Sequence, residues 1–143
     1  MNKQETKIFV VDDDMFQIEI IKQILNAQGF LDVITFESGE ACLEEIHQNP
    51  DIVFLDHQMG EYTGDETLQK IKRFNPNIFV VMVTGQEDIN TAVGTLKHGA
   101  FDYIQKNDDL EKKIIKVLDK VEIVKEMLKE NKTSLLKKIL KYI

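Results

Sequence analysis

The sequence predicts an α/β fold in which a five-stranded parallel sheet is covered by helices on both faces. Five short, β-rich apolar runs alternate along the chain with longer segments of helical period. The runs are Ile8–Val11, Val33–Phe36, Ile52–Leu55, Ile78–Val83 and Phe101–Ile104. Several are apolar without alternation, as strands buried on both faces are. Five successive strand–helix units favour a parallel sheet with right-handed crossovers.

The segments between the runs carry apolar residues at helical spacing. The stripes are Phe16, Ile20, Ile24 and Leu25; Leu43 and Ile46; Leu68 and Ile71; Ile89, Ala92, Val93 and Leu96; and Leu110, Ile114, Val117, Leu118 and Val121. Gly29 and Gly99 stand where helices need a left-handed C-terminal cap. We therefore expect one helix after each strand.

Length and composition indicate one compact domain. A chain of 143 residues would divide into halves near the lower limit of independent stability. Cys42 is the only cysteine, so no intramolecular disulfide can form, and three scattered histidines add no zinc-finger ligand set. The N-terminal residues lack the apolar stretch of a signal peptide, and no later stretch could span a membrane. We therefore expect a cytoplasmic protein.

The charge is unevenly distributed. Residues 1–110 hold 8 basic and 20 acidic side chains, whereas residues 111–143 hold 10 basic and 5 acidic ones. An acidic body argues against nucleic-acid binding, because phosphate backbones need basic surfaces. The basic tail could bind an acidic surface, although a solvated helix face is the commoner meaning of such a pattern.

Polar side chains follow the predicted strands at their carboxyl ends. Asp12-Asp13-Asp14 follows the first, Asp56 the third and Thr84-Gly85 the fourth, and the fifth leads to Lys106. Parallel strands place these ends on one edge of the sheet, where sites form in such folds. One aspartate at a strand end is often only a cap, but capping does not explain all of these residues together.

Clustered carboxylates repel one another, so such a site needs raised pKa values or a cation. Oxygen ligands without histidine or cysteine select a hard ion, and so few protein ligands suit Mg²⁺. A carboxylate beside Mg²⁺ can act as a nucleophile toward a phosphoryl group, whose charged oxygens need partners such as Lys106 and Thr84. The sequence thus predicts a phosphoacceptor site.

Over residues 6–122 the sequence resembles the response regulator receiver domain of two-component signalling, the CheY-like family. The resemblance rests on Asp12-Asp13 after FVV, on PDIVFLD ending at Asp56 and leading to Met59 and Gly64, on VTG at 83–85, and on GAFDYIQK ending at Lys106. It implies a doubly wound, flavodoxin-like sheet of strand order 2-1-3-4-5. It also implies a switch that accepts its phosphoryl group from a sensor histidine kinase or histidine phosphotransfer protein and acts on a downstream protein target.

The resemblance implies a role for each matching residue. Asp56 would be the phosphoacceptor, and Asp13, Asp56 and the backbone carbonyl of Gln58 would bind Mg²⁺, with Asp12 acting largely through a coordinated water. Lys106 and Thr84 would each contact a phosphoryl oxygen. Tyr103 would turn inward when Thr84 is drawn to the phosphoryl group.

Three positions depart from the family pattern. Gly60 stands where proline is usual, Thr63 where aspartate or asparagine is common, and Asn107 where proline commonly follows the lysine. The last change favours a trans peptide after Lys106, because cis bonds are costly without proline. These departures affect loop geometry rather than the chemistry.

Other interpretations stand beside these. Asp14 is expected to cap the next helix, and His57 to be exposed without a catalytic role. A haloacid-dehalogenase-like phosphatase would use Asp12 as nucleophile and Asp14 as acid/base, but it leaves Asp56 unexplained. A docking module with a vestigial site is the third alternative.

For the tail, residues 123–143, the sequence predicts an extension of the fifth helix followed by an additional amphipathic helix. Residues 131–134 read as a break with a new N-cap at Thr133 or Ser134. An uninterrupted coiled coil with Asn131 in its seam is the alternative. We expect helix-mediated protein contact, either with the domain itself or in a homodimer, rather than binding to a membrane interface, since no second anchor is evident. A homodimer would form through these helices or through the face of helix 4, strand 5 and helix 5. No DNA-binding or catalytic output domain fits the remaining residues, so protein contact is the expected output unless the chain is part of a longer protein.

Overall fold

The computed structural model describes residues 1–57, 63–85, 89–107 and 109–142. Five parallel strands, β1 (Ile8–Val11), β2 (Val33–Phe36), β3 (Ile52–Asp56), β4 (Phe79–Thr84) and β5 (Asp102–Gln105), form one sheet of order β2-β1-β3-β4-β5. This confirms the predicted sheet. The first two strands have the predicted bounds, and the last two begin and end one residue later than expected.

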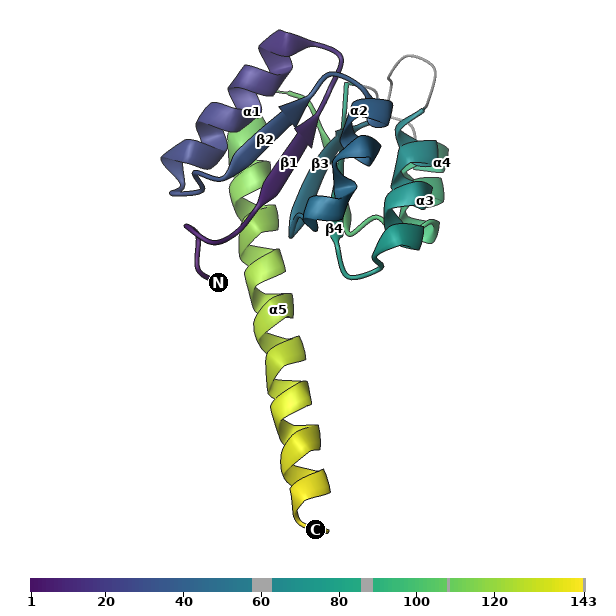
Figure 1. Ribbon diagram of the computed structural model, residues 1–143. Coiled ribbons are helices and arrows are strands. Elements are labelled where there is room, and N and C mark those ends of the chain that lie inside the picture. The colour runs from purple at the N-terminus through teal and green to yellow at the C-terminus, as the bar shows by residue number, and fades with distance from the viewer. Residues whose placement is uncertain (58–62, 86–88, 108, 143) are drawn as a thin grey trace.

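The helices cover both faces of the sheet (Figure 1). They are α1 (Met15–Ala27), α2 (Gly39–Glu44), α3 (Gly64–Phe74), α4 (Ile89–Lys97) and α5 (Leu110–Leu140), with a short 3-10 helix η1 (Ile46–Gln48) after α2. α1 and α5 lie on one face, and α2, α3 and α4 lie on the other. The second helix, α2, is shorter than predicted. Leu43 lies in α2, but Ile46, the second residue of its predicted apolar stripe, lies in η1.

Two apolar cores follow from the alternation of side chains along each strand. In β1, Ile8 and Val10 pack against α1 and α5, whereas Phe9 and Val11 pack toward α2 and α3. Both sets are at most 1% exposed. A strand that is apolar at every position is thus explained by burial on both faces.

The turns confirm the predicted caps. Gly29 and Gly99 have φ angles of +96° and +101°, the left-handed region in which residues with a Cβ are strained. Thr63 is the N-cap of α3, where its hydroxyl oxygen accepts a hydrogen bond of 3.2 Å from the Glu66 backbone N–H. Thr63 stands where aspartate or asparagine is common in the family, and it caps the helix as those residues can.

The predicted break in the tail is wrong. α5 is one helix from Leu110 to Leu140, and its second half extends beyond the sheet (Figure 1). Thr133 does not begin a new helix, because its hydroxyl donates to the Lys129 carbonyl, 3.0 Å away and one turn earlier. No apolar side chain of residues 122–140 is buried in the described structure. The first turns of this segment meet the domain through polar contacts, such as the pair of Lys125 with Asp51.

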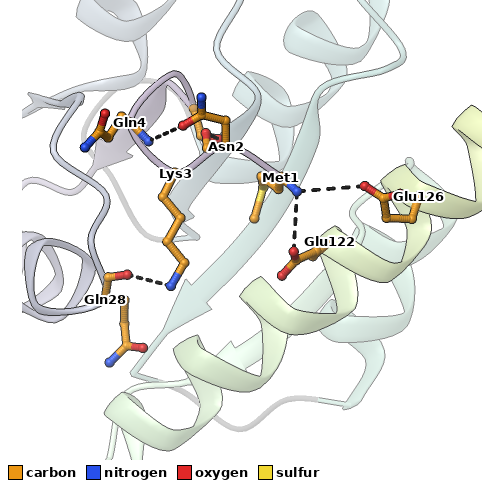
Figure 2. Close-up of polar contacts among 8 residues, drawn as sticks. Met1, Asn2, Lys3, Gln4, Gln28, Glu122 and Glu126 are labelled. Carbon is orange, nitrogen blue, oxygen red and sulfur yellow. Dashed lines mark hydrogen bonds and ion pairs between the residues drawn. The ribbon is translucent and has the colours of Figure 1, made fainter.

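The N-terminal residues contact α5 where this helix leaves the domain (Figure 2). The ammonium group of Met1 lies 3.4 Å from Glu122 Oε1 and 3.8 Å from Glu126 Oε1. The Nζ of Lys3 donates to the Gln28 carbonyl, 2.8 Å away, which ties the same segment to the end of α1. These contacts fix the first exposed turns of α5 relative to the sheet.

Candidate functional site

The predicted site residues meet at the carboxyl edge of the sheet. Val11 pairs with Leu55, so Asp12 and Asp56 follow neighbouring strands at the same level. Asp56 is aligned with Val83, which places Thr84 one residue further along the next strand. Parallel registration, rather than proximity in sequence, therefore brings these polar groups together.

Three carboxylates form the centre of the site. Asp12, Asp13 and Asp56 each offer one oxygen, and these oxygens lie within 4.8 Å of one another. Asp12 and Asp56 are 1% and 5% exposed, whereas Asp13 is open to solvent. Two buried carboxylates with an exposed third make a site that is accessible from one side only.

Lys106 supplies positive charge to this cluster. Its Nζ lies 2.6 Å from Asp12 Oδ2 and 3.5 Å from Asp56 Oδ1, and it is largely covered by protein. The Lys106 backbone N–H donates to the Thr84 carbonyl at 2.7 Å, which fixes the base of the lysine beside β4. Buried carboxylates need such compensation, because an unpaired buried charge is strongly destabilising.

Asp12 and Asp14 have different roles although they lie two residues apart. Oδ1 of Asp12 accepts from the Asp14 backbone N–H at 2.9 Å, so both oxygens of Asp12 are engaged. Asp14 is the N-cap of α1, and its side chain accepts from the Phe16 N–H at 2.9 Å. The expected capping role of Asp14 is confirmed, and its side chain is engaged away from the carboxylate cluster.

Gly64 closes the loop around Asp56. Its N–H donates to the His57 carbonyl at 2.8 Å. A Cβ at this position would lie 2.6 Å from His57 Cα, so only glycine fits without moving the backbone. In the sequence, Gly64 stood out only as part of the family motif, and its close approach to the Asp56–His57 backbone was not predicted. His57 itself is half-buried rather than exposed.

Thr84 and Tyr103 lie on neighbouring strands. Thr84 is 1% exposed at the end of β4, and Tyr103 is half-buried opposite Met82. Tyr103 also lines an open hollow of about 370 Å³ between α4, β5 and α5, together with Ile89 and Val117. Tyr103 therefore lies on the strand next to Thr84 and also borders a concave surface patch.

Two expectations concern the loops. Gln58, whose carbonyl was expected to bind the metal, lies outside the described residues, as does Gly60. The peptide after Lys106 is not cis, since none of the bonds in the described ranges is. The three carboxylates that the structure does place are hard oxygen ligands, and so small a set of protein ligands fits Mg²⁺ with retained waters.

A family model, the response regulator receiver domain, matches residues 8–119. The chain belongs to this family, whose members are the receiver modules of two-component signalling. Membership removes the phosphatase alternative, in which Asp14 would have been the acid/base.

Among the relatives, the transcriptional regulatory protein ZraR of Klebsiella oxytoca is 38% identical over 113 residues, which are 78% of this chain and 25% of ZraR. The DNA-binding transcriptional regulator NtrC of Escherichia coli K12 is 32% identical over 75% of this chain and 23% of its own length. The chain thus spans about a quarter of these relatives.

The solved structures give the same family. A CheY-like response regulator receiver domain protein from Methanospirillum hungatei JF-1 superposes with a TM-score of 0.70 at 30% identity, covering 82% of this chain and 96% of that one. DNA binding is part of NtrC's name, and this chain covers 23% of NtrC. The absence of a nucleic-acid partner therefore stays a prediction for this chain. None of the described helices meets the length and hydropathy that a membrane span requires.

Proposed function

We propose that Asp56 accepts a phosphoryl group, with Mg²⁺ bound by the neighbouring carboxylates, and that the modified domain switches a protein-interaction surface. The observation that carries the proposal is the convergence of Asp12, Asp13 and Asp56 within 4.8 Å beside Lys106. Three carboxylates and one ammonium at a strand edge suit the handling of a phosphoryl group better than any structural role.

In the proposed reaction, a carboxylate oxygen of Asp56 attacks the phosphorus of a partner's phosphohistidine or of a small acyl phosphate. The new O–P bond forms as the P–N bond, or the P–O bond to the acyl group, breaks, and the leaving group departs with its electron pair. The product is a mixed anhydride. Water later attacks its phosphorus, which releases phosphate and restores Asp56.

The chain's own residues position this reaction. Lys106 Nζ, 3.5 Å from Asp56 Oδ1, is placed to exchange its contact with Asp12 for one with a phosphoryl oxygen. Thr84 at the end of β4 donates its hydroxyl to another phosphoryl oxygen. Mg²⁺, when bound by Asp13, Asp56 and the Gln58 carbonyl, offsets the charge of the carboxylates and of the incoming group.

The test is labelling with acetyl phosphate, with and without a metal chelator. We expect a phosphoryl adduct to form with Mg²⁺, read by intact mass, and to be lost when the chelator is added. As a mixed anhydride, the adduct should be labile in acid and in base. Restoring excess Mg²⁺ is the control for chelator damage. A protein that neither binds Mg²⁺ nor becomes labelled would instead be a docking module with a vestigial site.

The surface that we propose to switch is the α4–β5–α5 face, where Tyr103 lines the 370 Å³ hollow. Drawing Thr84 toward the phosphoryl group vacates space into which Tyr103 can turn, and phosphorylation thereby shifts a pre-existing equilibrium. Thr84→Ala should remain labelled while its NMR shifts around Tyr103 respond less than in the wild type. Identical responses in the two proteins would contradict the coupling.

The proposed partners follow from this reaction. The donor is a sensor histidine kinase or a histidine phosphotransfer protein in the cytoplasm, and the output is contact with a downstream protein or with a second copy through the α4–β5–α5 face. The chain itself is a signalling switch that transfers and hydrolyses only its own phosphoryl group.

A further inference from the structure

A second concave surface lies at the opposite end of the sheet. Where α5 passes the amino ends of the strands, it forms a corner with the loops before β3, β4 and β5 (Figure 1). The hollow in this corner measures about 840 Å³, within the range of roughly 300–1,000 Å³ that is usual for ligand sites. None of the residues assigned to phosphotransfer lines it.

Part of the lining of the hollow is apolar. Phe79 and Phe101 lie edge to face, with ring centroids 5.0 Å apart, and both line it. Leu128 of α5 lines it from the other wall and is 53% exposed. A large apolar side chain exposed beside aromatic rings gains free energy when another apolar group covers it.

Lysines form the wall along α5. Lys125, Lys129 and Lys132 line the hollow, and their spacing of four and three residues places them on one side of the helix. Lys125 is paired with Asp51 at 2.9 Å. Within the described part of the chain, no acidic side chain pairs with Lys129 or Lys132, although the whole protein carries a net charge of −7.

A second copy of this chain is a poor occupant. One apolar stripe of α5 runs through the half-buried Val124 and the exposed Leu128 and Leu135. Helical spacing places Lys125 and Lys132 on one flank of this stripe and Lys120 and Lys138 on the other. Lys120 and Lys125 are already paired with Asp102 and Asp51. Lys132 and Lys138 have no acidic partner within the described residues, so two such helices packed along their stripes would bring these lysines together, and like charges so placed are destabilising.

A flat membrane surface is excluded by shape. The lysines and Leu128 line a corner whose other wall is the domain itself, with Phe79 and Phe101 in its lining. A bilayer covers a helix that lies on the surface with its apolar face outward, but it cannot enter a corner between a helix and a domain. A polypeptide segment can.

We propose that this hollow docks an acidic, amphipathic segment of a partner protein. Its apolar side chains would lie on Leu128 and the Phe79–Phe101 pair, and its carboxylates would meet Lys129 and Lys132. The proposal stands independently of Asp56, because the hollow lies at the far end of the strands and shares no residue with the phosphotransfer site.

The experiment uses the full chain and a synthetic peptide of about 20 residues, long enough to hold a helix, with a leucine stripe flanked by glutamates. Fluorescence anisotropy compares this peptide with a scrambled peptide of the same composition. We expect the amphipathic peptide to bind at least about tenfold more tightly, a difference of about 1.4 kcal/mol. NMR shifts should change at Phe79, Phe101 and Leu128.

Matched charge reversals locate the contact. Lys129→Glu/Lys132→Glu should weaken binding about tenfold or more, whereas Lys112→Glu/Lys137→Glu, the same charge change at exposed residues outside the hollow, should have little effect. Equal losses in both variants, or equal binding of the scrambled peptide, would overturn the proposal. So would tighter binding to anionic phospholipid vesicles or inorganic phosphate, or a dimer in sedimentation that depends on Leu128.

Discussion

At the residue scale, the two buried aspartates of the site are held differently. Asp12 uses both carboxylate oxygens within the protein, one toward the Asp14 N–H at 2.9 Å and one toward Lys106 at 2.6 Å. Asp56 is 3.5 Å from the same ammonium group. The longer contact suits the proposed nucleophile, because a looser ion pair is more easily exchanged for a new bond.

Gly64 gives a stability prediction with a matched control. Gly64→Ala should destabilise the domain by about 1–3 kcal/mol, because its Cβ would meet the backbone of the loop that carries Asp56. Gly94→Ala, in the middle of α4 with no atom within 4 Å of the new Cβ, should instead stabilise it by about 0.5–1 kcal/mol. Urea unfolding measures both, and equal midpoints would contradict the close approach at Gly64.

Cys42 gives a prediction of pH dependence. Burial raises the pKa of its thiol from 9.0 to about 12. The folded state therefore holds the proton longer than the unfolded state, and the free energy of unfolding falls as pH rises from about 9 toward 12. Cys42→Ala should reduce this alkaline fall. Iodoacetamide at neutral pH should modify wild-type Cys42 only in denaturant, and rapid alkylation of the native protein would contradict the burial.

At the scale of elements, the strands and the caps at Asp14, Gly29 and Gly99 could be predicted from the sequence. The length of α2 and the continuity of α5 could not. Strands buried on both faces leave an apolar run that is visible in sequence, as in β1 and β3. Thr133 looks like an N-cap in sequence, yet the same hydroxyl can bond to a carbonyl one turn earlier inside a helix. Local residues alone do not decide between these two hydrogen bonds.

Deleting residues 131–143 tests the account of α5. The part of this segment that the structure describes buries no side chain, so the thermal midpoint should stay within about a degree or two of wild type while the helical signal in circular dichroism falls. Sedimentation of the full chain and the truncated chain should also agree. A clearly lower melting temperature would mean that the segment packs on the domain.

At the scale of the whole molecule, the two ends of the sheet differ in charge. The carboxyl ends of the strands gather carboxylates, and the amino ends face the lysines of α5. The residues at the carboxyl ends of the strands could be predicted, because each follows a strand directly in the sequence. The hollow at the amino ends could not be predicted, because Leu128 comes to lie beside the Phe79–Phe101 pair only through the uninterrupted course of α5.

The central claim is that Asp56 carries the phosphoryl group, and one comparison tests it most directly. Wild type, Asp56→Asn and Asp12→Asn are incubated with acetyl phosphate and Mg²⁺, and the adduct is located by intact mass and peptide mapping after borohydride trapping. Our account predicts that the adduct disappears in Asp56→Asn. In wild type, and in any labelled fraction of the Asp12→Asn variant, the adduct should map to position 56. Equal labelling of Asp56→Asn and wild type, or an adduct on Asp12, would contradict it.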